Sequence, residues 1–183
     1  LSEEQLQGLP ESAIATYAQT AKEKGKEGYI VTLQIPSFSP FMKYSTNREL
    51  RKELYTAYHT QCTHENEFDN QDLVKTLVNL RMRRAQLLGY PCVADFVLTR
   101  RMAENSERVY HLINQLLNAY APTANKEMNE LQALAKELEG EDFELMPWDL
   151  AYYAEKLKEK KFNFNLVEAI TDLQTEQQRH YLE

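Results

Sequence analysis

The strongest constraint on the fold is a long run of apolar residues that recur every three or four positions. Between residues 105 and 121, the positions that share one helical face are Val109, Leu112, Ile113, Leu116, Leu117 and Tyr120. The pattern resumes from Met128 to Leu138 and stops at Gly140, while Pro122 predicts a kink or break between the two parts. Only 5 Gly and 6 Pro occur in 183 residues, so helix breakers are scarce and a mainly helical fold is expected.

Shorter apolar patterns predict further helices, each bounded by residues that start or stop helices. The expected helices cover residues 10–24, 46 to about 62 (opened by a capping box at 46–49), 70 to 89, about 92–100, and about 148–160. The polar stretch 63–70 and the acidic stretch 141–144 are expected to be loops. Residues 165–181 carry a weaker helical pattern.

One short segment departs from the helical pattern. Residues 29–35 are rich in β-branched side chains and predict a strand that ends at Pro36. A lone strand leaves unpaired edges, so this segment either pairs with polypeptide outside the chain or is simply extended. Residues 36–42 are expected to be an aromatic connector. The predicted fold is therefore a multi-helix array with one short extended segment.

Charge and composition exclude several classes of partner. Lys and Arg number 21 against 28 Asp and Glu, and the net charge of −7 argues against a nucleic-acid surface. Arg81, Arg83 and Arg84 are expected to spread around a helix as a salt-bridged face. No apolar run approaches the roughly 20 residues that span a bilayer, so no membrane partner is expected. Cys62 and Cys92 have no metal or redox spacing and are expected to be free thiols.

A cytoplasmic location is the default expectation for a chain of this composition. The chain begins at Leu1 rather than Met, so the removal of an upstream leader stays open.

The catalytic candidates are few. Residues 64–68 read His-Glu-Asn-Glu-Phe and come nearest to the His-Glu-x-x-His motif, in which two His four positions apart hold one zinc ion. The fifth position is Phe68 rather than His, and the stretch lies in a polar loop. His59, His111 and His180 are scattered, and no nucleophile elbow or glycine-rich phosphate loop occurs. The sequence therefore predicts no metal ligand and no catalytic residue.

The segment around the only Trp of the chain is the most distinctive. Pro147 suits the first turn of a helix, and Asp149 suits the positive end of the helix dipole. Trp148 and Tyr152 lie four positions apart and so share a helical face, whereas Tyr153 points elsewhere. Physical chemistry alone favours an aromatic helix start that anchors a core.

Several stretches, in order, resemble the zinc oligopeptidases, a family that includes thimet oligopeptidase, neurolysin and the bacterial peptidyl-dipeptidases. They are Leu-Pro-Glu at 9–11, Gly-Tyr-Ile-Val-Thr-Leu at 28–33 followed by Pro-Ser at 36–37, Asn-Arg-Glu-Leu-Arg at 47–51, Leu-Leu-Gly at 87–89, Ala-Asp-Phe at 94–96, and Pro-Trp-Asp with Tyr-Tyr at 147–149 and 152–153. Each piece is short, but their order and spacing over residues 9–164 are specific.

The resemblance implies a helical lobe over residues 1–164, part of a neurolysin-like fold that walls a catalytic channel, and a divergent tail over 165–183. In that family the zinc-binding His-Glu-x-x-His and a further Glu ligand lie C-terminal to this region. The implied function is that of a fragment of a zinc metallopeptidase that hydrolyses short peptides. The fragment itself is expected to bind no zinc and to be inactive, with the catalytic half of the same protein as its partner.

Tyr152 and Tyr153 are the only candidates for residues that face substrate. An alternative from another class is a free-standing helical binding or scaffold domain, which the acidic balance and the amphipathic helices permit. An isolated lobe is expected to expose apolar surface that its missing half would cover, and therefore to self-associate weakly.

Overall fold

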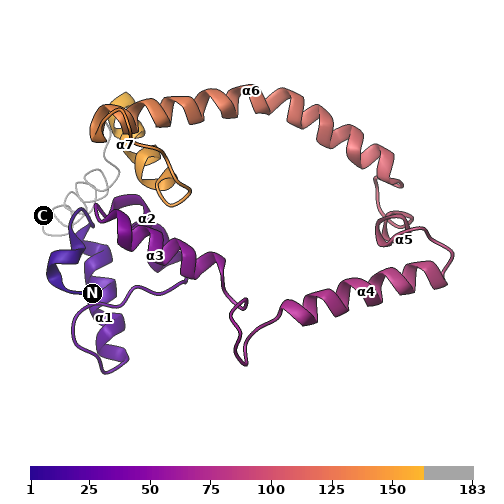
Figure 1. Cartoon of the computed structure of the whole chain (residues 1–183), viewed down its shortest axis with the longest axis horizontal. Helices are drawn as coiled ribbons and strands as arrows, with labels where there is room; N and C mark the ends of the chain where they lie inside the picture. Colours follow the sequence, from indigo (N-terminus) through magenta and orange to yellow (C-terminus); the bar gives the residue numbers. More distant parts are fainter. Residues whose placement is uncertain (163–183) are drawn as a thin grey trace, which may run out of the picture. The chain divides into compact units, whose positions relative to one another are not determined.

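The computed structural model describes residues 1–162, and their regular structure is entirely helical (Figure 1). The elements are η1 (Glu3–Leu6), α1 (Glu11–Glu23), α2 (Ile35–Tyr44), α3 (Arg48–His59), α4 (Gln71–Leu87), α5 (Val93–Leu98), α6 (Ser106–Glu139) and α7 (Leu150–Phe162). The mainly helical prediction is therefore confirmed. The pattern at 165–181 lies outside the described residues.

The chain divides into two compact units. Within the described residues, unit 1 comprises residues 1–59 and 129–162, and unit 2 comprises residues 60–128. Helix α6 contributes residues to both units because the division falls within it.

The connector predicted at 36–42 is wrong, because these residues form most of α2. Pro36 occupies the first turn, where a missing N–H costs nothing, but Pro40 lies inside the helix. Helix α2 packs against α1, α3 and α7, so it is the central helix of unit 1. Burial on three sides offsets the helix-breaking tendency of Pro40.

The strand predicted at 29–35 is also wrong. Ile35 already belongs to α2, and no strand is present among residues 1–162. Residues 29–34 form no regular secondary structure, which agrees with the alternative of a segment that is simply extended.

The apolar core of unit 1 lies where α1 meets α2. Tyr17 and Phe41 are almost completely buried there, with ring centroids 6.4 Å apart. Leu6, Leu9 and Ala13 complete the cluster. The Tyr17 hydroxyl donates a 2.8 Å hydrogen bond to the Ser37 carbonyl, so its burial leaves no polar atom unpaired. Burial raises the pKa of Tyr17 to about 12.

Two predicted helix boundaries need correction. Helix α3 is capped by Asn47, whose Oδ1 accepts the Leu50 N–H at 3.1 Å, whereas the Thr46 hydroxyl donates to the Gln7 carbonyl at 3.3 Å. The N-cap therefore lies one residue later than predicted and no reciprocal capping box forms, and α3 ends at His59 rather than near 62.

Pro122 does not break α6, which runs through it from Ser106 to Glu139. Long helical stretches on both sides propagate cooperatively, and the proline removes only a single backbone hydrogen bond.

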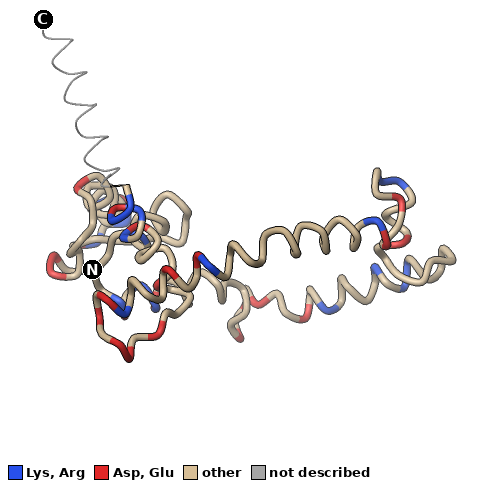
Figure 2. Tube along the Cα trace, turned by 90° about the horizontal axis from the view of Figure 1, so that it is seen from above, with Lys and Arg blue, Asp and Glu red and all other residues tan. Residues whose placement is uncertain are grey.

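Unit 2 has little core. Ala85 is its only fully buried residue, in the region where α4 packs against α5. The Arg84 guanidinium lies 5.2 Å from the centre of the Phe96 ring, whose centroid is 5.3 Å from that of Tyr90. Arg81, Arg83 and Arg84 are exposed, but among residues 1–162 no ion pair involves them, so only the salt-bridged part of the prediction fails. Figure 2 shows Lys and Arg in blue along the chain, including those toward the end of α4.

The apolar faces predicted for α4 and α6 exist, but within unit 2 they are exposed. On α4 they comprise Leu73, Val74, Leu77, Val78, Leu80 and Leu87. On the first part of α6 they comprise Leu112, Ile113, Leu116, Leu117 and Tyr120, whereas Val109 is half-buried. Within residues 1–162, no helix is both long enough and apolar enough to span a membrane. Cys62 and Cys92 are free, as predicted.

Candidate functional site

The distinctive Trp-containing segment leads into α7 in unit 1, and Asp149 is its pivotal residue. The Asp149 side chain is completely buried immediately before the first residue of the helix. Its Oδ2 accepts the Met146 N–H at 3.1 Å, and its carbonyl accepts the Tyr153 N–H at 3.0 Å. The carboxylate thus lies at the positive end of α7, as the sequence predicts, and fixes the turn before it.

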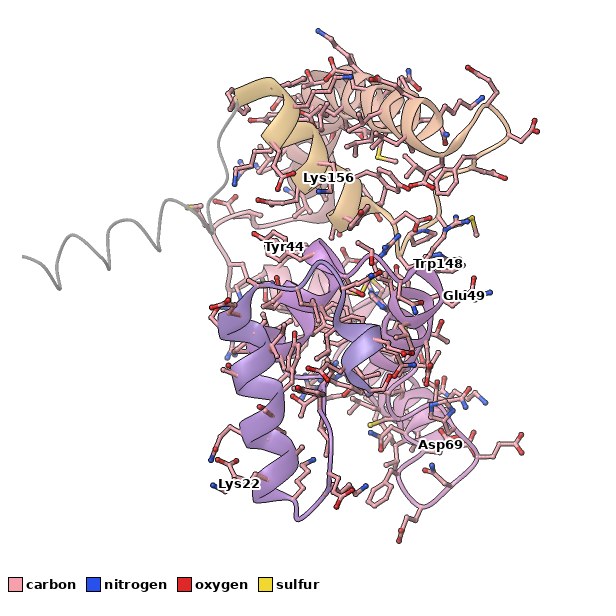
Figure 3. All side chains as sticks on the ribbon, turned by 90° about the vertical axis from the view of Figure 1, so that its left-hand side faces the viewer. Lys22, Tyr44, Glu49, Asp69, Trp148 and Lys156 are labelled. Carbon is pink, nitrogen blue, oxygen red and sulfur yellow. The ribbon has the colours of Figure 1, made fainter. Side chains whose placement is uncertain are left out.

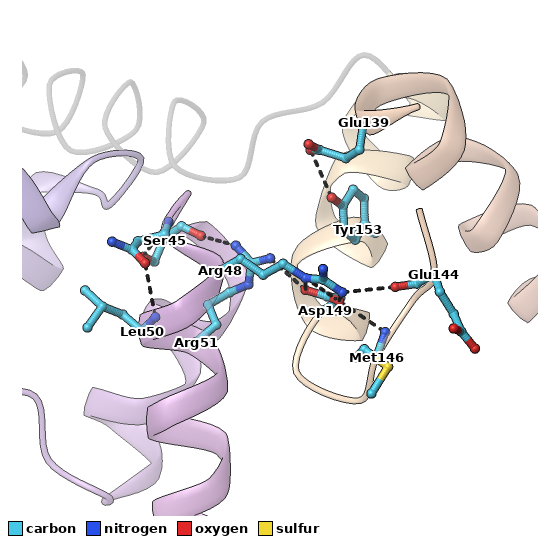
Figure 4. A network of polar contacts seen from close by, with 10 residues as sticks. Ser45, Arg48, Leu50, Arg51, Glu139, Glu144, Met146, Asp149 and Tyr153 are labelled. Atoms are coloured by element: carbon cyan, nitrogen blue, oxygen red, sulfur yellow. Dashed lines mark hydrogen bonds and ion pairs between the residues drawn. The ribbon is translucent and has the colours of Figure 1, made fainter. Parts of the chain in front are cut away.

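Two arginines of α3 meet this carboxylate, and we call the three side chains the Arg–Asp clamp (Figure 4). Arg48 Nη2 lies 2.7 Å from Asp149 Oδ2, with its Nε 3.0 Å from the same oxygen. Arg51 Nη2 lies 2.9 Å from Oδ1. Because Arg48 and Arg51 are three positions apart, they share one face of α3 and reach both oxygens. The clamp therefore ties α3 to the start of α7 through charge-assisted hydrogen bonds.

Backbone carbonyls accept further hydrogen bonds from the two guanidinium groups. Arg48 Nη2 donates to the Glu144 carbonyl at 3.0 Å, and Arg51 Nη1 donates to the Ser45 carbonyl at 2.7 Å. Arg51 is only 1% exposed, and its Nε is the buried side-chain atom without a hydrogen-bond partner in the described part of the chain.

Aromatic rings cover the two cations. The Arg48 guanidinium lies 4.3 Å from the centre of the Phe143 ring, and that of Arg51 lies 4.3 Å from the centre of the Tyr152 ring. Two cations share one carboxylate here, so the electron-rich ring faces offset part of the excess positive charge.

Electrostatics favour the ionised form of Asp149. Burial works to raise its pKa, but hydrogen bonds from Arg48, Arg51 and the Met146 N–H outweigh burial and hold the pKa below its ordinary value. The hydrogen bond to Asp149 likewise raises the pKa of Arg48. The clamp is a persistent ion network rather than a proton-transfer site.

The structure separates the two candidate substrate-facing tyrosines. Tyr153 is 1% exposed, and its hydroxyl donates to Glu139 Oε1 at 3.0 Å. Burial first, and then this hydrogen bond, raise its pKa above the ordinary value. Tyr153 is therefore part of the core that joins α7 to the end of α6.

Tyr152 is only half-buried and lines a pocket of about 210 Å³ in unit 1. The polar side chains of this pocket include Lys43, Tyr44, Glu155, Lys156 and Glu159. Figure 3 labels Tyr44 on α2 and Lys156 on α7, which contribute to its two sides. Lys156 Nζ lies 3.2 Å from Glu159 Oε2, so the pocket is polar and carries both signs of charge.

Trp148 shares a side with Tyr152 along the chain but packs on α3. Its ring lies 6.3 Å from that of Tyr55, and the Lys52 ammonium lies 5.3 Å from its centre. The aromatic segment is thus an anchor, in agreement with the expectation from physical chemistry.

The histidines do not assemble a metal centre in the described part of the chain. No group of three or more His, Cys, Asp or Glu side chains could hold one metal ion among residues 1–162. His64 Nε2 lies 3.3 Å from the Thr60 hydroxyl, and His59 Nδ1 lies 2.9 Å from the Tyr55 carbonyl. These residues do not fit a zinc site.

Sequence reasoning missed Arg48 and Arg51 as site residues. The available signal was the Asn-Arg-Glu-Leu-Arg run, which places two arginines beside the inward-facing Leu50. A buried arginine requires an anion, and Asp149 lies almost a hundred positions away along the chain, so the sequence offered no way to pair them.

Comparisons with known proteins place this arrangement in context. Peptidase family M3 matches residues 41–178, which include all three residues of the clamp. The chain is 40% identical over 167 residues to oligopeptidase A of Escherichia coli K12, covering 89% of this chain and 24% of that protein.

Two further relatives are peptidases with other names. Identity is 29% over 162 residues to dipeptidyl carboxypeptidase of E. coli K12, covering 88% of this chain and 24% of the relative. The chain is also 29% identical over 172 residues to saccharolysin of Saccharomyces cerevisiae, covering 90% of this chain and 24% of that protein. The chain thus spans about a quarter of the length of the curated relatives it matches. With a family match over most of its length, this chain belongs to peptidase family M3.

Proposed function

We propose that this chain is a non-catalytic scaffold part of a zinc-dependent oligopeptidase that hydrolyses short peptides. In this proposal, polypeptide outside the 183 residues supplies the zinc ligands and the reacting groups. The chain contributes a helical wall and has no peptidase activity by itself. The expected partners are short peptide substrates and the catalytic part of the same protein, in the cytoplasm.

The family match is the observation that carries this proposal. Relatives named oligopeptidase A and dipeptidyl carboxypeptidase align with almost the whole chain, yet only about a quarter of each relative is matched. The M3 peptidases are metallopeptidases, in which a bound zinc ion polarises the scissile carbonyl and activates water. The His-Glu-Asn-Glu-Phe stretch at 64–68 lacks the second His that such a site needs.

The Arg–Asp clamp gives the scaffold role a physical basis. It joins two segments about a hundred residues apart in sequence, and both oxygens of its carboxylate accept charge-assisted hydrogen bonds. A buried ion network of this kind positions neighbouring elements rather than reacting with a substrate. Tyr152, which stacks on Arg51 and lines the polar pocket, is our candidate for the substrate-facing residue, and Tyr153 supports it from the core.

The test is peptide hydrolysis with metal analysis. The purified 183-residue chain is incubated with a quenched oligopeptide, with and without added zinc, and its metal content is determined by elemental analysis. We expect neither turnover nor stoichiometric zinc. Chelator-sensitive cleavage by this chain, or one tightly held zinc ion per chain, would contradict the proposal.

Tyr152 is tested in a longer protein that contains both this chain and a His-Glu-x-x-His motif. Tyr152→Phe keeps the ring over Arg51, whereas Tyr152→Ala removes it. A substrate-facing role predicts a raised KM with unchanged thermal stability for Tyr152→Phe. An unchanged KM in that variant would remove Tyr152 from the substrate channel.

The second candidate is a free-standing helical binding or scaffold domain, which the exposed apolar faces of unit 2 also permit. Leu87 is 80% exposed and Tyr120 67% exposed, and an apolar surface of this kind normally contacts another protein. The two candidates differ in the polypeptide encoded downstream. A His-Glu-x-x-His motif in the same reading frame supports the peptidase, and its absence supports the free-standing domain.

A further inference from the structure

A group of exposed arginines in unit 2 has no part in the proposed function. Residues 81–101 contain five arginines and a single acidic residue, Asp95, in a chain whose net charge is −7. We call the five the arginine cluster; they are Arg81, Arg83, Arg84, Arg100 and Arg101, all exposed. Asp95 does not neutralise them, because its oxygens accept hydrogen bonds from Cys92 Sγ at 3.2 Å and Ser106 Oγ at 2.9 Å. Within residues 1–162 no ion pair involves the cluster, so its positive charge is uncompensated there.

Phe96 of α5 links the two parts of the cluster. The Arg84 guanidinium lies 5.2 Å from the centre of the Phe96 ring, and Arg81 lies three positions earlier on the same face of α4. Thr99 keeps helical backbone angles, with φ −55° and ψ −22°. Arg100, four positions after Phe96, therefore lies about one turn beyond it on the same side. Because α4 also packs against α5, arginines from both segments share one surface of unit 2.

The same surface carries large apolar side chains. Leu87 and Leu88 follow Arg84 by three and four positions, so they lie on its face of α4. Both are exposed, Leu87 by 80%, and Met102, directly after Arg101, is 98% exposed. Exposed apolar side chains that lie together among charged groups are typical of a surface that binds another protein.

The choice of cation also indicates a protein partner. No lysine occurs between Lys75 and Lys126, so every cation of the cluster is a guanidinium. Arginine and methionine are enriched where proteins bind one another, whereas lysine is depleted. A guanidinium group can also pair with a carboxylate through two parallel hydrogen bonds. A nucleic-acid backbone is bound by lysine and arginine alike and requires no exposed leucine or methionine beside them.

We propose that the arginine cluster is a docking surface for an acidic segment of another protein, in which aspartate or glutamate alternates with apolar side chains. The carboxylates of this segment pair with the exposed guanidinium groups, and its apolar side chains cover Leu87, Leu88 and Met102. Exposed ion pairs contribute little free energy by themselves. The apolar contacts therefore supply much of the affinity, and the charges select and orient the partner.

This inference goes beyond the proposed peptidase role and does not depend on it. It uses only residues 81–102 of unit 2, and the partner is bound rather than cleaved. The hydrolysis test of the scaffold role and the binding tests of this surface can therefore fail separately.

The first experiment measures the binding of three fluorescent probes to the 183-residue chain by anisotropy. One probe is an acetylated peptide in which glutamate alternates with leucine, and the second has serine in place of leucine at the same charge. The third is a single-stranded oligothymidylate of the same net charge. We expect the leucine peptide to bind at least about fivefold more tightly than either other probe. Equal binding of the two peptides would reduce the site to bulk electrostatics and overturn the proposal, and so would tighter binding of the oligonucleotide.

The second experiment tests the charges. Arg81→Gln with Arg100→Gln removes two cations from the cluster, and Lys75→Gln with Lys126→Gln removes two exposed cations from the rest of unit 2 as a matched control. We expect the arginine pair to weaken binding of the leucine peptide about three- to tenfold and the lysine pair to weaken it less than about twofold. All four side chains are exposed, so thermal unfolding should be unchanged. Equal weakening by the two pairs would show that only net charge matters, and the docking surface would be refuted.

The third experiment tests the apolar contacts. In Leu87→Ser with Met102→Ser the leucine peptide should bind no more tightly than the serine peptide does. Leu77→Ser with Leu116→Ser removes exposed leucines outside the cluster and should leave the affinity unchanged. Equal losses in the two variants would place the peptide on the apolar faces of α4 and α6 and contradict the proposal.

Sedimentation of the Arg81→Gln, Arg100→Gln variant without peptide distinguishes a second copy of this chain from a different protein. We expect its self-association to equal that of the original chain. If these substitutions abolish self-association but leave peptide binding unchanged, the surface belongs to a contact between copies, and the proposal is wrong.

Discussion

Unit 1 and unit 2 are built from similar amphipathic helices but differ in what those helices bury. Unit 1 encloses an apolar cluster around Tyr17 and Phe41 and, separately, the Arg–Asp clamp. Unit 2 buries only Ala85 and exposes the apolar faces of α4 and α6. Helical periodicity therefore indicates which side of a helix is apolar, but not whether that side is covered within the same chain.

The difference also shows what holds unit 1 together. Removing charges from water is costly, and a buried arginine is tolerated only beside a carboxylate with good geometry. Asp149 is shared by two arginines, so each guanidinium depends on one anion. Unit 2 contains no buried ion pair of this kind, and its pairs, such as Arg108 with Glu104 at 2.7 Å, lie at the surface. Such surface pairs contribute little to stability.

The largest effect is expected from Asp149→Ala. It leaves Arg51 buried without a counterion and should lower the free energy of unfolding by about 3–5 kcal/mol, as measured by denaturant titration. Asp142→Ala, in the preceding loop and exposed, is the matched control and should change it by less than about 0.5 kcal/mol. Similar values for the two variants would show that the clamp does not stabilise unit 1.

Acid should affect unit 1 through the same carboxylate, though less severely, because protonation keeps the side chain in place. The pKa of Asp149 is lower in the folded chain than its ordinary value of 3.8. The folded state thus binds fewer protons at this group, and its stabilisation is complete above pH 3.8 and lost as the pH falls through the lower, folded-state pKa.

This acid sensitivity is measured from hydrogen exchange of α3 and α7 amides between pH 5 and the onset of unfolding. Asp149→Asn should flatten the dependence on pH, because the substituted group does not titrate. A wild-type dependence that persists in Asp149→Asn would assign the effect to other carboxylates.

Gly8→Ala tests the close backbone approach beside the polar pocket of unit 1. Gly8 has φ +85°, and an added Cβ would lie 2.3 Å from the Tyr44 carbonyl oxygen. We expect a loss of about 2–3 kcal/mol from left-handed strain and displacement of backbone. Gly25, with φ +63° and no atom within 4 Å of its added Cβ, is the control and should lose about 1 kcal/mol as alanine. Thermal unfolding of both variants shows whether the loss of stability comes mainly from the clash with the Tyr44 carbonyl or from the positive φ alone.

The smallest stability effect is expected in unit 2. Leu77 is 47% exposed, so Leu77→Ala should change the free energy of unfolding by no more than about 0.5 kcal/mol. Leu6→Ala in the core of unit 1 should cost about 2–5 kcal/mol.

If the exposed faces cause weak self-association, Leu77→Gln with Leu116→Gln should shift sedimentation toward the monomer. A chain that is already strictly monomeric at high concentration would refute that association.

Local pattern was sufficient for most helices because their signals lie within a few residues. Apolar spacing, Asn70, Gly89 and Gly140 placed α4 and α6 close to their observed ends. The same local reasoning failed for α2. Two prolines within a few residues predict a connector, and only contacts with three other helices outweigh that preference.

The sequence by itself determined the helical class, the amphipathic faces, the aromatic anchor at 147–153 and the membership in a peptidase family. These properties depend on residues close together in the chain or on their order along it. Only the tertiary structure decided that Arg48 and Arg51 share Asp149, that Tyr153 is core while Tyr152 lines a pocket, and that the apolar faces of unit 2 stay exposed. Each of these depends on which distant side chains meet and on the water their contact excludes, and no periodicity within one segment carries that information.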